Sequence, residues 1–333
     1  MEISASSIIA IEDSHPSSQK VAVITGAAVS FLSALQTYAT NSPQQSGIGS
    51  WLATHMHGLG YLIVVCDCNK AGGQAVATSL DASGKTAIFI HCDVKDYASQ
   101  QELFKEVWAK WTRLDVLIAN AGCVDRGSLY NFGRRNAGVN DLPPEPDMSC
   151  TDIDFKGVVY GTTLATHFMR LNSHGKGGKI IVTGSMIGIY PCQTFPEYCA
   201  AKAAAHQWVK TMGPILQRKE NITINCVMPG GIETPAMPGF SLAFLPKQMT
   251  RKSNLISGYE VFLKDTANKM SGITLEASHD TLIEWGHPGY KSGEFAKRTE
   301  AVFEPWFELL HGERSGLPSA IQDWPDKDLI DIP

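Results

Sequence analysis

The sequence predicts a doubly wound α/β fold, in which a parallel sheet carries helices on both faces. Short β-branched apolar runs alternate with longer amphipathic runs along the chain. A glycine-rich turn follows the first of these runs. Of the 333 residues, 44% are hydrophobic and 18% are charged, which is a globular composition. The length fits one large α/β domain or two ordinary ones, and the alternation of strand and helix patterns favours one domain.

Six segments are expected to be strands because they are short, apolar and rich in β-branched residues. They are Lys20–Thr25, Tyr61–Cys66, Thr86–His91, Val116–Ala119, Lys179–Thr183 and Thr223–Val227. The stretches between them have helical periodicity, as where Leu103, Phe104, Val107, Trp108 and Trp111 recur on one face. Right-handed crossovers then place the ligand crevice at the carboxyl ends of the strands.

The first turn is a glycine cradle that is interrupted. Residues 25–28 read TGAA and residues 46–49 read SGIG, with 29–45 between them. Without that segment the glycines fall at the spacing of a dinucleotide fingerprint, which permits a tight turn and close approach to a pyrophosphate. The residues expected to form this cradle are Gly26, Ser46, Gly47, Ile48 and Gly49.

Two interpretations of residues 29–45 stay open. The segment begins with Val-Ser and ends with Gln, which a GT splice donor and a CAG acceptor can encode, so it reads as the translation of a retained intron. Alternatively, it is a surface insertion that loops outward and lets the cradle close, since long loops cost little free energy. The first interpretation makes the chain a catalytically inactive member of its class.

An acidic residue follows the second predicted strand. Asp67 lies 18 residues after Gly49, where a carboxylate binds the adenosine ribose hydroxyls. An acid at this point repels a 2′-phosphate, so NAD is favoured over NADP.

The candidate catalytic group follows the fifth predicted strand. Tyr198 comes 13 residues after Ser185, and Lys202 lies four residues further along an expected helix, on the same face as Tyr198. A tyrosine with a pKa near 10 becomes a base at neutral pH only when that pKa falls by about 3 units. The Lys202 ammonium and a cationic nicotinamide ring favour that fall, and a serine hydroxyl holds the substrate oxygen. We therefore expect hydride transfer between a secondary alcohol and a nicotinamide, with the proton passing through Tyr198.

These motifs, together with the Asn-Ala-Gly block at 120–122, resemble the short-chain dehydrogenase/reductase family. The Tyr-Cys-Ala-Ala-Lys block at 198–202 and the stretch SMIGIYP at 185–191 are similar to the NAD-linked 15-hydroxyprostaglandin dehydrogenases and their fungal relatives. The resemblance runs from about Lys20 to about Pro235. It implies a Rossmann-type fold and the catalytic trio Ser185, Tyr198 and Lys202.

The resemblance also implies further contacts with the cofactor. Asp93 and Val94 would hold the adenine, and Asn120 would stabilise the sheet beside the cofactor. The residues implied on the nicotinamide side are Pro229, Ile232 and Thr234.

One position departs from the family pattern. Asp154 stands where the family usually has an asparagine that holds a water in the proton relay. A carboxylate still accepts hydrogen bonds from water but brings charge near Lys202. We expect the relay to work with the carboxylate, the alternative being altered activity.

The predicted organisation has three parts. Residues 1–19 are expected to be a flexible arm, 20–275 the dehydrogenase domain with a lid at 232–269, and 276–333 a C-terminal extension. Residues 295–310 are expected to form one amphipathic helix that covers the pocket or contacts another subunit. The apolar lid residues either pack on the core or form a pocket for a lipid, terpenoid, steroid or polyketide; they are Met237, Phe240, Leu242, Phe244, Leu245 and Met249.

Composition excludes other functions. The net charge of −5 argues against nucleic-acid binding, and no apolar run is long enough to span a membrane. The eight cysteines are expected to be reduced structural thiols in a cytoplasmic chain, without a metal site. The predicted function is NAD-dependent interconversion of a secondary alcohol and a ketone on a bulky apolar substrate. Fungal secondary metabolism is the expected setting, and a homo-oligomer is the expected assembly. The alternatives are an NADPH-dependent ketoreductase and an inactive pseudoenzyme.

Overall fold

A computed structural model describes residues 18–28, 47–173, 175, 177–234 and 242–322. Its sheet has eight strands in the order β3-β2-β1-β4-β5-β6-β7-β8. Strands β1 to β7 pair in parallel, and β8 is antiparallel to β7. The strands are β1 Val21–Thr25, β2 Leu62–Asp67, β3 Ala87–His91, β4 Val116–Ala119, β5 Gly178–Thr183, β6 Ile222–Pro229, β7 Thr274–Ser278 and β8 Thr281–Glu284. The strand order reverses between β1 and β4, which confirms the predicted doubly wound fold.

The six predicted strands all form, with ends that differ from the prediction by at most two residues. In five of these six strands almost every residue is buried, which explains their near-continuous apolar sequences. The sequence prediction missed β7 and β8. Because β7 pairs with β6 from Cys226↔Thr274 onward, the domain limit expected at 275 falls inside a strand of the sheet.

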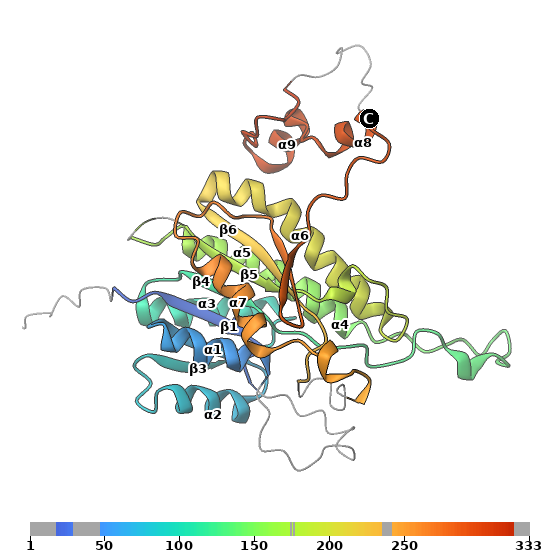
Figure 1. Cartoon of the computed structure of the whole chain (residues 1–333), viewed down its shortest axis with the longest axis horizontal. Helices are drawn as coiled ribbons and strands as arrows, with labels where there is room; N and C mark the ends of the chain where they lie inside the picture. The colour runs from blue at the N-terminus through green and yellow to red at the C-terminus, as the bar shows by residue number, and fades with distance from the viewer. Residues whose placement is uncertain (1–17, 29–46, 174, 176, 235–241, 323–333) are drawn as a thin grey trace, which may run out of the picture.

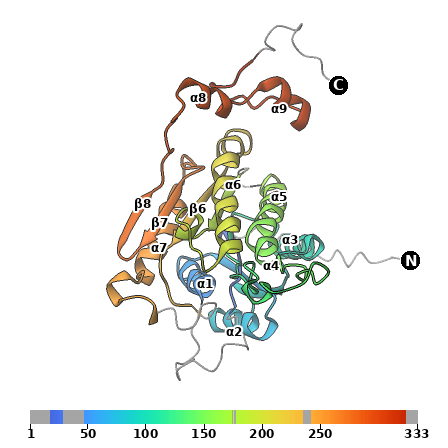
Figure 2. The same ribbon diagram turned by 90° about the vertical axis from the view of Figure 1, so that its right-hand side faces the viewer.

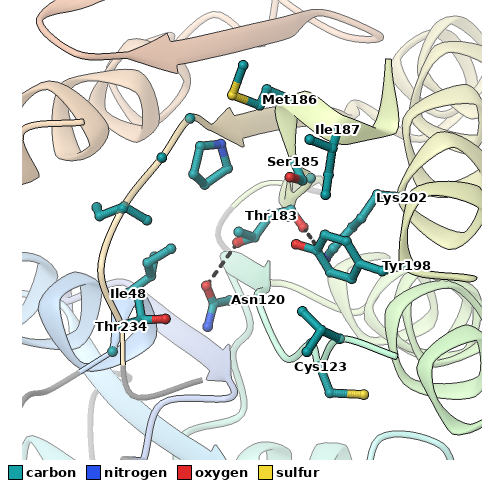
Figure 3. A pocket seen from close by; sticks show the side chains of 18 of the residues that line it. Ile48, Asn120, Cys123, Thr183, Ser185, Met186, Ile187, Tyr198, Lys202 and Thr234 are labelled. Atoms are coloured by element: carbon teal, nitrogen blue, oxygen red, sulfur yellow. Dashed lines mark hydrogen bonds between the residues drawn. The ribbon is translucent and has the colours of Figure 1, made fainter. Parts of the chain in front are cut away.

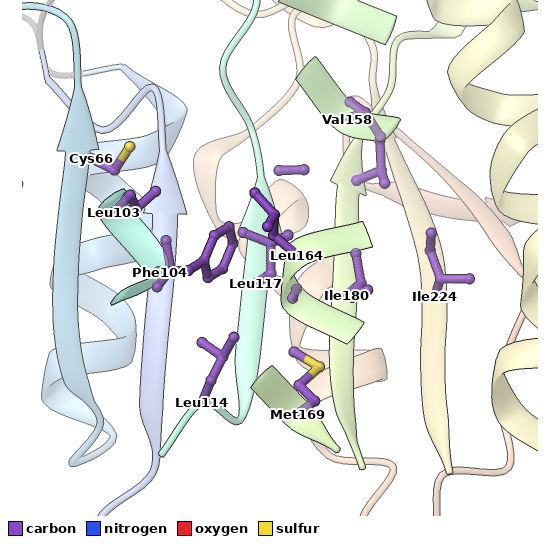
Figure 4. Packing of buried hydrophobic residues seen from close by; sticks show 14 of the residues in the cluster. Cys66, Leu103, Phe104, Leu114, Leu117, Val158, Leu164, Met169, Ile180 and Ile224 are labelled. Atoms are coloured by element: carbon purple, nitrogen blue, oxygen red, sulfur yellow. The ribbon is translucent and has the colours of Figure 1, made fainter. Parts of the chain in front are cut away.

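Three long helices cover each face of the sheet (Figures 1 and 2). On one face lie α1 Ile48–Gly58, α2 Lys70–Leu80 and α7 Lys252–Leu263; on the other lie α3 Tyr97–Trp111, α5 Gly157–Met169 and α6 Pro196–Glu220. Figure 4 shows the second face, where Phe104 of α3 and Leu164 of α5 pack on Leu117 of β4. The two apolar clusters hold the sheet rigidly between the helix layers, so the strand ends are fixed points.

The segment 232–269, expected to be a lid, contains a core helix. Tyr259 and Phe262 of α7 are 0% and 1% exposed, and they pack on the sheet. A helix held by fully buried aromatic side chains does not open and close, so residues 252–263 form part of the core. The stretch before α7 includes the 3-10 helix Pro246–Gln248, while Met237 and Phe240 lie outside the described residues.

The C-terminal extension forms two short helices where one was predicted. They are α8 Glu294–Glu300 and α9 Glu304–His311, and the extended residues between them interrupt the helical pattern. Lys219, near the end of α6, pairs with Glu313 at 3.3 Å. Because α6 rises about 30 Å from Tyr198 to Arg218, this contact lies at the opposite end of the fold from the tyrosine (Figure 1). The helices α8 and α9 therefore do not cover the pocket.

Among the described residues, no helix is both long and apolar enough to cross a bilayer. Residues 1–17 of the expected N-terminal arm lie outside the described part of the chain.

Candidate active site

A cavity of about 260 Å³ opens at the carboxyl ends of β1, β4 and β5 (Figure 3). Parallel strands bring loops that are far apart in sequence to this edge of the sheet. The structure brings together ten residues of the predicted site along its wall: Gly26, Gly47, Ile48, Asn120, Ser185, Tyr198, Lys202, Pro229, Ile232 and Thr234.

The two halves of the glycine turn meet in space. Gly26 has φ +63°, and a Cβ atom there would lie 2.6 Å from Cα of Ala121. A Cβ atom on Gly49 would lie 2.4 Å from the carbonyl oxygen of Gly26, so the start of α1 packs directly on the end of β1. Backbone contacts this close permit only glycine. Ser46 and residues 29–45, predicted as cradle and insertion, lie outside the described residues.

Gly47 is placed differently from its two neighbours in the fingerprint. It is the N-cap of α1 with φ −75° and ψ 177°, and a Cβ atom there would meet nothing within 4 Å. An open helix N-terminus beside a glycine is suited to a phosphate group, because its N–H groups have no partner inside the helix.

Asn120 joins three strands beneath the cavity. Its Nδ2 donates to the carbonyl oxygens of Thr25 at 3.0 Å and Gly26 at 3.1 Å, and its Oδ1 accepts from Oγ1 of Thr183 at 3.1 Å. The first and last of these contacts tie β1, β4 and β5 together at their ends. This position agrees with the structural role implied by the family resemblance.

Ser185, Tyr198 and Lys202 converge on the cavity (Figure 3). Tyr198 and Lys202 share one face of α6, while Ser185 follows the end of β5 and precedes the 3-10 helix Met186–Gly188. The Lys202 ammonium lies 5.5 Å from the centroid of the Tyr198 ring and donates to the carbonyl oxygen of Thr183 at 2.8 Å.

Asp154 lies behind Lys202, away from the cavity wall. Its Oδ1 is 2.8 Å from Nζ of Lys202, and its Oδ2 accepts from the N–H of Cys123 at 2.9 Å. It belongs to a π-helical turn, Asp152–Lys156, that connects α4 Ser149–Thr151 to α5. Burial acts to lower the pKa of Lys202, but the attraction and hydrogen bond of Asp154 together with the influence of Tyr198 outweigh it and raise that pKa, so Lys202 stays a cation.

The pKa of Tyr198 is raised by the protein groups around it. Burial has the largest effect, and it exceeds the opposing influence of Lys202 and of a hydrogen bond with Ser185. The sequence analysis expected the pKa of Tyr198 to fall, but that expectation included a cationic nicotinamide ring as well as Lys202. The protein groups by themselves therefore do not make Tyr198 a base at neutral pH.

Four of the predicted cofactor contacts that the structure describes do not line the cavity: Gly49, which packs on Gly26, and Asp67, Asp93 and Val94. Asp67 ends β2, and its carboxylate accepts from the N–H groups of Ala28 and Asn69, both at 2.9 Å. Ala28 itself lines the cavity, so Asp67 lies directly behind the wall. The Asp93 carboxylate pairs with Lys95 at 3.2 Å, while Val94 is 9% exposed.

The sequence prediction missed much of the apolar wall. The additional lining side chains are Cys123, Val124, Met186, Ile187, Cys192 and Phe195. All of them except Cys192 lie within four residues of Asn120, Ser185 or Tyr198, and that proximity was the available signal. Phe244, one of the apolar residues predicted for the lid, also lines the cavity.

The described residues fit a dinucleotide cofactor. The open N-terminus at Gly47 suits a pyrophosphate, and the glycine contact between Gly26 and Gly49 leaves the turn without side chains. Pro229, Ile232 and Thr234 border the same cavity as Tyr198, where a nicotinamide ring would meet the catalytic groups.

Comparison with known proteins agrees with this geometry. The family model described as short chain dehydrogenase matches residues 44–241. A short-chain dehydrogenase/reductase, prx6 of Penicillium rubens, is 42% identical over 303 residues, which cover 91% of this chain and 97% of the relative. The mouse 15-hydroxyprostaglandin dehydrogenase [NAD(+)] is 27% identical over 66% of this chain and 69% of its own length.

Another curated relative and a solved structure extend the comparison. The trans-4-hydroxycyclohexanecarboxylate dehydrogenase of Sinomonas cyclohexanicum is 28% identical over 77% of this chain and 90% of its own. The crystal structure of a short-chain type dehydrogenase/reductase from Mycobacterium marinum superposes with a TM-score of 0.63 at 25% identity, covering 78% of this chain and 94% of that one.

The fold and site define a dinucleotide-dependent oxidoreductase of the doubly wound α/β class. This chain belongs to the short-chain dehydrogenase/reductase family, whose members use nicotinamide cofactors and bind small-molecule substrates. The family resemblance predicted from the sequence is thereby confirmed.

Proposed function

We propose that this protein interconverts a secondary alcohol and a ketone on a bulky apolar substrate, with NAD as the hydride carrier. The observation that carries the proposal is the convergence of Tyr198, Ser185 and Lys202 on one cavity beside the glycine turn. A half-buried tyrosine and a buried lysine on one helix face, next to an open helix N-terminus suited to a phosphate, support this chemistry.

Each catalytic side chain has a separate role. Bound NAD supplies the hydride acceptor, and its cationic ring adds to the charge of Lys202 in lowering the pKa of Tyr198. Tyr198 takes the hydroxyl proton of the alcohol, and the Ser185 hydroxyl holds the same oxygen in place. Lys202 stabilises the tyrosinate, and Asp154 keeps Lys202 charged and oriented.

The cofactor preference depends on Asp67. Its carboxylate lies behind Ala28 at the cavity wall, so a 2′-phosphate on the adenosine ribose would meet a negative charge. This favours NAD over NADP. A mouse relative carries NAD(+) in its name.

The substrate is expected to be apolar and uncharged around the reacting carbon. Apart from Lys202, the cavity wall in the described residues carries no charged side chain. The undescribed segments 29–46 and 235–241, which flank the site in sequence, contain no Asp, Glu, Lys or Arg. Lys202 is already paired with Asp154, so a carboxylate or phosphate on the substrate would find no unpaired cation on the described cavity wall, which favours a lipid, terpenoid, steroid or polyketide alcohol. A role in fungal secondary metabolism, a cytoplasmic location and a homo-oligomeric state remain predictions from the sequence.

The contact between Gly49 and Gly26 supports an active protein despite the interruption at 29–45. Both halves of the cradle lie in place, so an outward loop is compatible with cofactor binding. The retained-intron interpretation is tested separately by sequencing the mature transcript.

Calorimetric titration with NAD and with NADPH tests the proposal on this chain beside a variant that lacks 29–45. We expect both proteins to bind NAD more tightly than NADPH. Tyr198→Phe should then bind NAD normally while turnover falls by about 10²–10⁴-fold. Tighter NADPH binding would favour the ketoreductase alternative. Binding only by the deletion variant would assign the activity to the shorter protein and make this chain inactive.

A further inference from the structure

Two thiols and a carboxylate converge behind the catalytic lysine. Cys123, Cys150 and Asp154 each offer one ligand atom, and these atoms lie within 4.8 Å of one another. Asp154 is 0% and Cys150 1% exposed, while Cys123 is half-buried and lines the cavity. The group is therefore sheltered from bulk solvent on one side and reachable from the cavity on the other.

The contacts within the group are short and directed. The Cys150 thiol lies 3.1 Å from the carbonyl oxygen of Cys123 and 3.6 Å from Oδ2 of Asp154. Tetrahedral zinc with two thiolate ligands places the two sulfurs roughly 3.8 Å apart, from a Zn–S distance of about 2.3 Å. The two sulfurs and an Asp154 oxygen already lie within 4.8 Å of one another, so modest side-chain shifts reach that geometry.

The surrounding charge also favours a cation. Carboxylate oxygens of Asp125 and Glu197 lie within 4.8 Å of each other and of the Cys150 sulfur. Of these two carboxylates and that of Asp154, only Asp154 has an ion-pair partner among the described residues, which is Lys202. Backbone N–H groups of Thr151, Glu197 and Tyr198 bind the other two carboxylates but bring no full positive charge.

We propose that Cys123, Cys150 and Asp154 form a binding site for a thiophilic divalent cation of the zinc type, and that occupancy inhibits the enzyme. On binding, each thiol releases its proton to solvent as its sulfur bonds to the metal, and Oδ2 of Asp154 gives the third ligand. Oδ1 of the same carboxylate holds Lys202 at 2.8 Å. A cation on Oδ2 weakens the attraction of Asp154 for Lys202 and repels the ammonium, so Lys202 loses its position under Tyr198. Only this inhibitory effect rests on the proposed function; metal binding does not.

Titration of the full, reduced and metal-free chain with Cd²⁺ tests the site through the ultraviolet thiolate-to-cadmium absorption. We expect one cation per chain and at least about tenfold weaker binding by Cys123→Ser, with loss of the band when Cys150→Ser is added. Cys68→Ser removes an exposed thiol elsewhere and should bind like the wild type. Because Cys150 is buried, thermal unfolding is used to check that the variant with Cys150→Ser still folds. Cys123 is only half-buried, so Cys123→Ser tests the site without depending on that check.

Four results would overturn the proposal, two for the binding site and two for its inhibitory role. The binding site is excluded by an absent band, or by a band that Cys123→Ser leaves unchanged. The inhibitory role is excluded when Cd²⁺ saturates the site without slowing alcohol oxidation, or when a chelator does not restore the rate. A chain without any turnover would contradict the proposed function but leave the cadmium band as a valid test of the site.

Discussion

The ammonium of Lys202 lies 2.8 Å from Oδ1 of Asp154, and the two side chains are 3% and 0% exposed. A buried pair of this kind is stable only while both charges are present, since either charge alone would be desolvated without compensation. The aspartate that departs from the family pattern is therefore an electrostatic partner of the catalytic lysine. Its other oxygen is bound by the Cys123 N–H, which fixes the carboxylate in place.

Removing the carboxylate should destabilise the fold. Asp154→Ala leaves Lys202 buried without a counter-charge, and we expect the free energy of unfolding to fall by about 3–5 kcal/mol. Asp154→Asn keeps an oxygen that accepts a hydrogen bond from Lys202, so its free energy of unfolding should fall by less. Urea denaturation measures both effects. Asp152→Ala is the matched control, because its ion pair with Lys156 is solvent-exposed and contributes at most about 1 kcal/mol. Equal losses for Asp152→Ala and Asp154→Ala would contradict a stabilising buried pair.

The glycine contact across the interrupted turn gives a second test. In Gly49→Ala the new methyl group meets the Gly26 carbonyl oxygen at 2.4 Å and Cα of Ala27 at 2.8 Å, both backbone atoms. We expect about 1–3 kcal/mol of destabilisation and a large loss of NAD affinity, because α1 must move away from β1. Gly58→Ala lies in the same helix with nothing within 4 Å and should leave the protein as stable or slightly more so. Thermal unfolding and NAD titration distinguish the two variants, and normal NAD binding by Gly49→Ala would show that the turn does not hold the pyrophosphate.

Cofactor choice should respond to the charge behind the cavity wall. Asp67→Ser removes the carboxylate, and we expect the ratio of NADPH to NAD affinity to rise by roughly tenfold or more, as electrostatic repulsion of about 1–2 kcal/mol is lost. The comparison variant Asp93→Asn removes the charge that pairs with Lys95, outside the cavity wall. A similar change of ratio in both variants would indicate a general effect of net charge and would remove Asp67 as the determinant of specificity.

The C-terminal helices should loosen at acid pH. The Glu304 carboxylate accepts from the Ser315 N–H at 2.8 Å and from the Gly316 N–H at 3.2 Å. Burial acts to raise the pKa of Glu304, but the hydrogen bonds from Ser315 and Gly316 outweigh it and lower that pKa. The stabilisation is therefore complete above the unfolded pKa of about 4.3 and is lost as pH falls through the lower pKa of the folded form.

Hydrogen exchange of the Ser315 and Gly316 amides, corrected for intrinsic rates, measures this loss. Protection should fall with acid in the wild type and stay low and independent of pH in Glu304→Gln. Protection that persists in Glu304→Gln would mean that other contacts hold the segment to α9.

Much of the fold could be predicted because each central strand of a doubly wound sheet is buried on both faces. That burial requires short, nearly continuous apolar runs, and β1 to β6 all have them. Strand β8 lies at the sheet edge with mostly exposed residues, so its sequence carries no such run. Helix α7 was also missed, although it is buried rather than exposed. Its apolar residues recur with only weak helical periodicity, so the segment was interpreted as a lid, whereas Tyr259 and Phe262 anchor it to the sheet.

The sequence by itself determined which residues form the catalytic group. Tyr198 and Lys202 share a helix face because they are four residues apart, and Ser185 lies nearby because it follows the end of a strand in a parallel sheet. Only the tertiary structure decided that Gly49 closes on Gly26 across the interruption, since that contact depends on how α1 docks on β1. It also decided that Asp154 pairs with Lys202 and adjoins Cys123 and Cys150. Asp154 is 48 positions from Lys202 and 31 from Cys123, and Cys123 is 27 positions from Cys150. These residues belong to the π-helical turn, α6, a loop and α4, so only the packing of helices on the sheet brings them together, and no local pattern in the sequence records that packing.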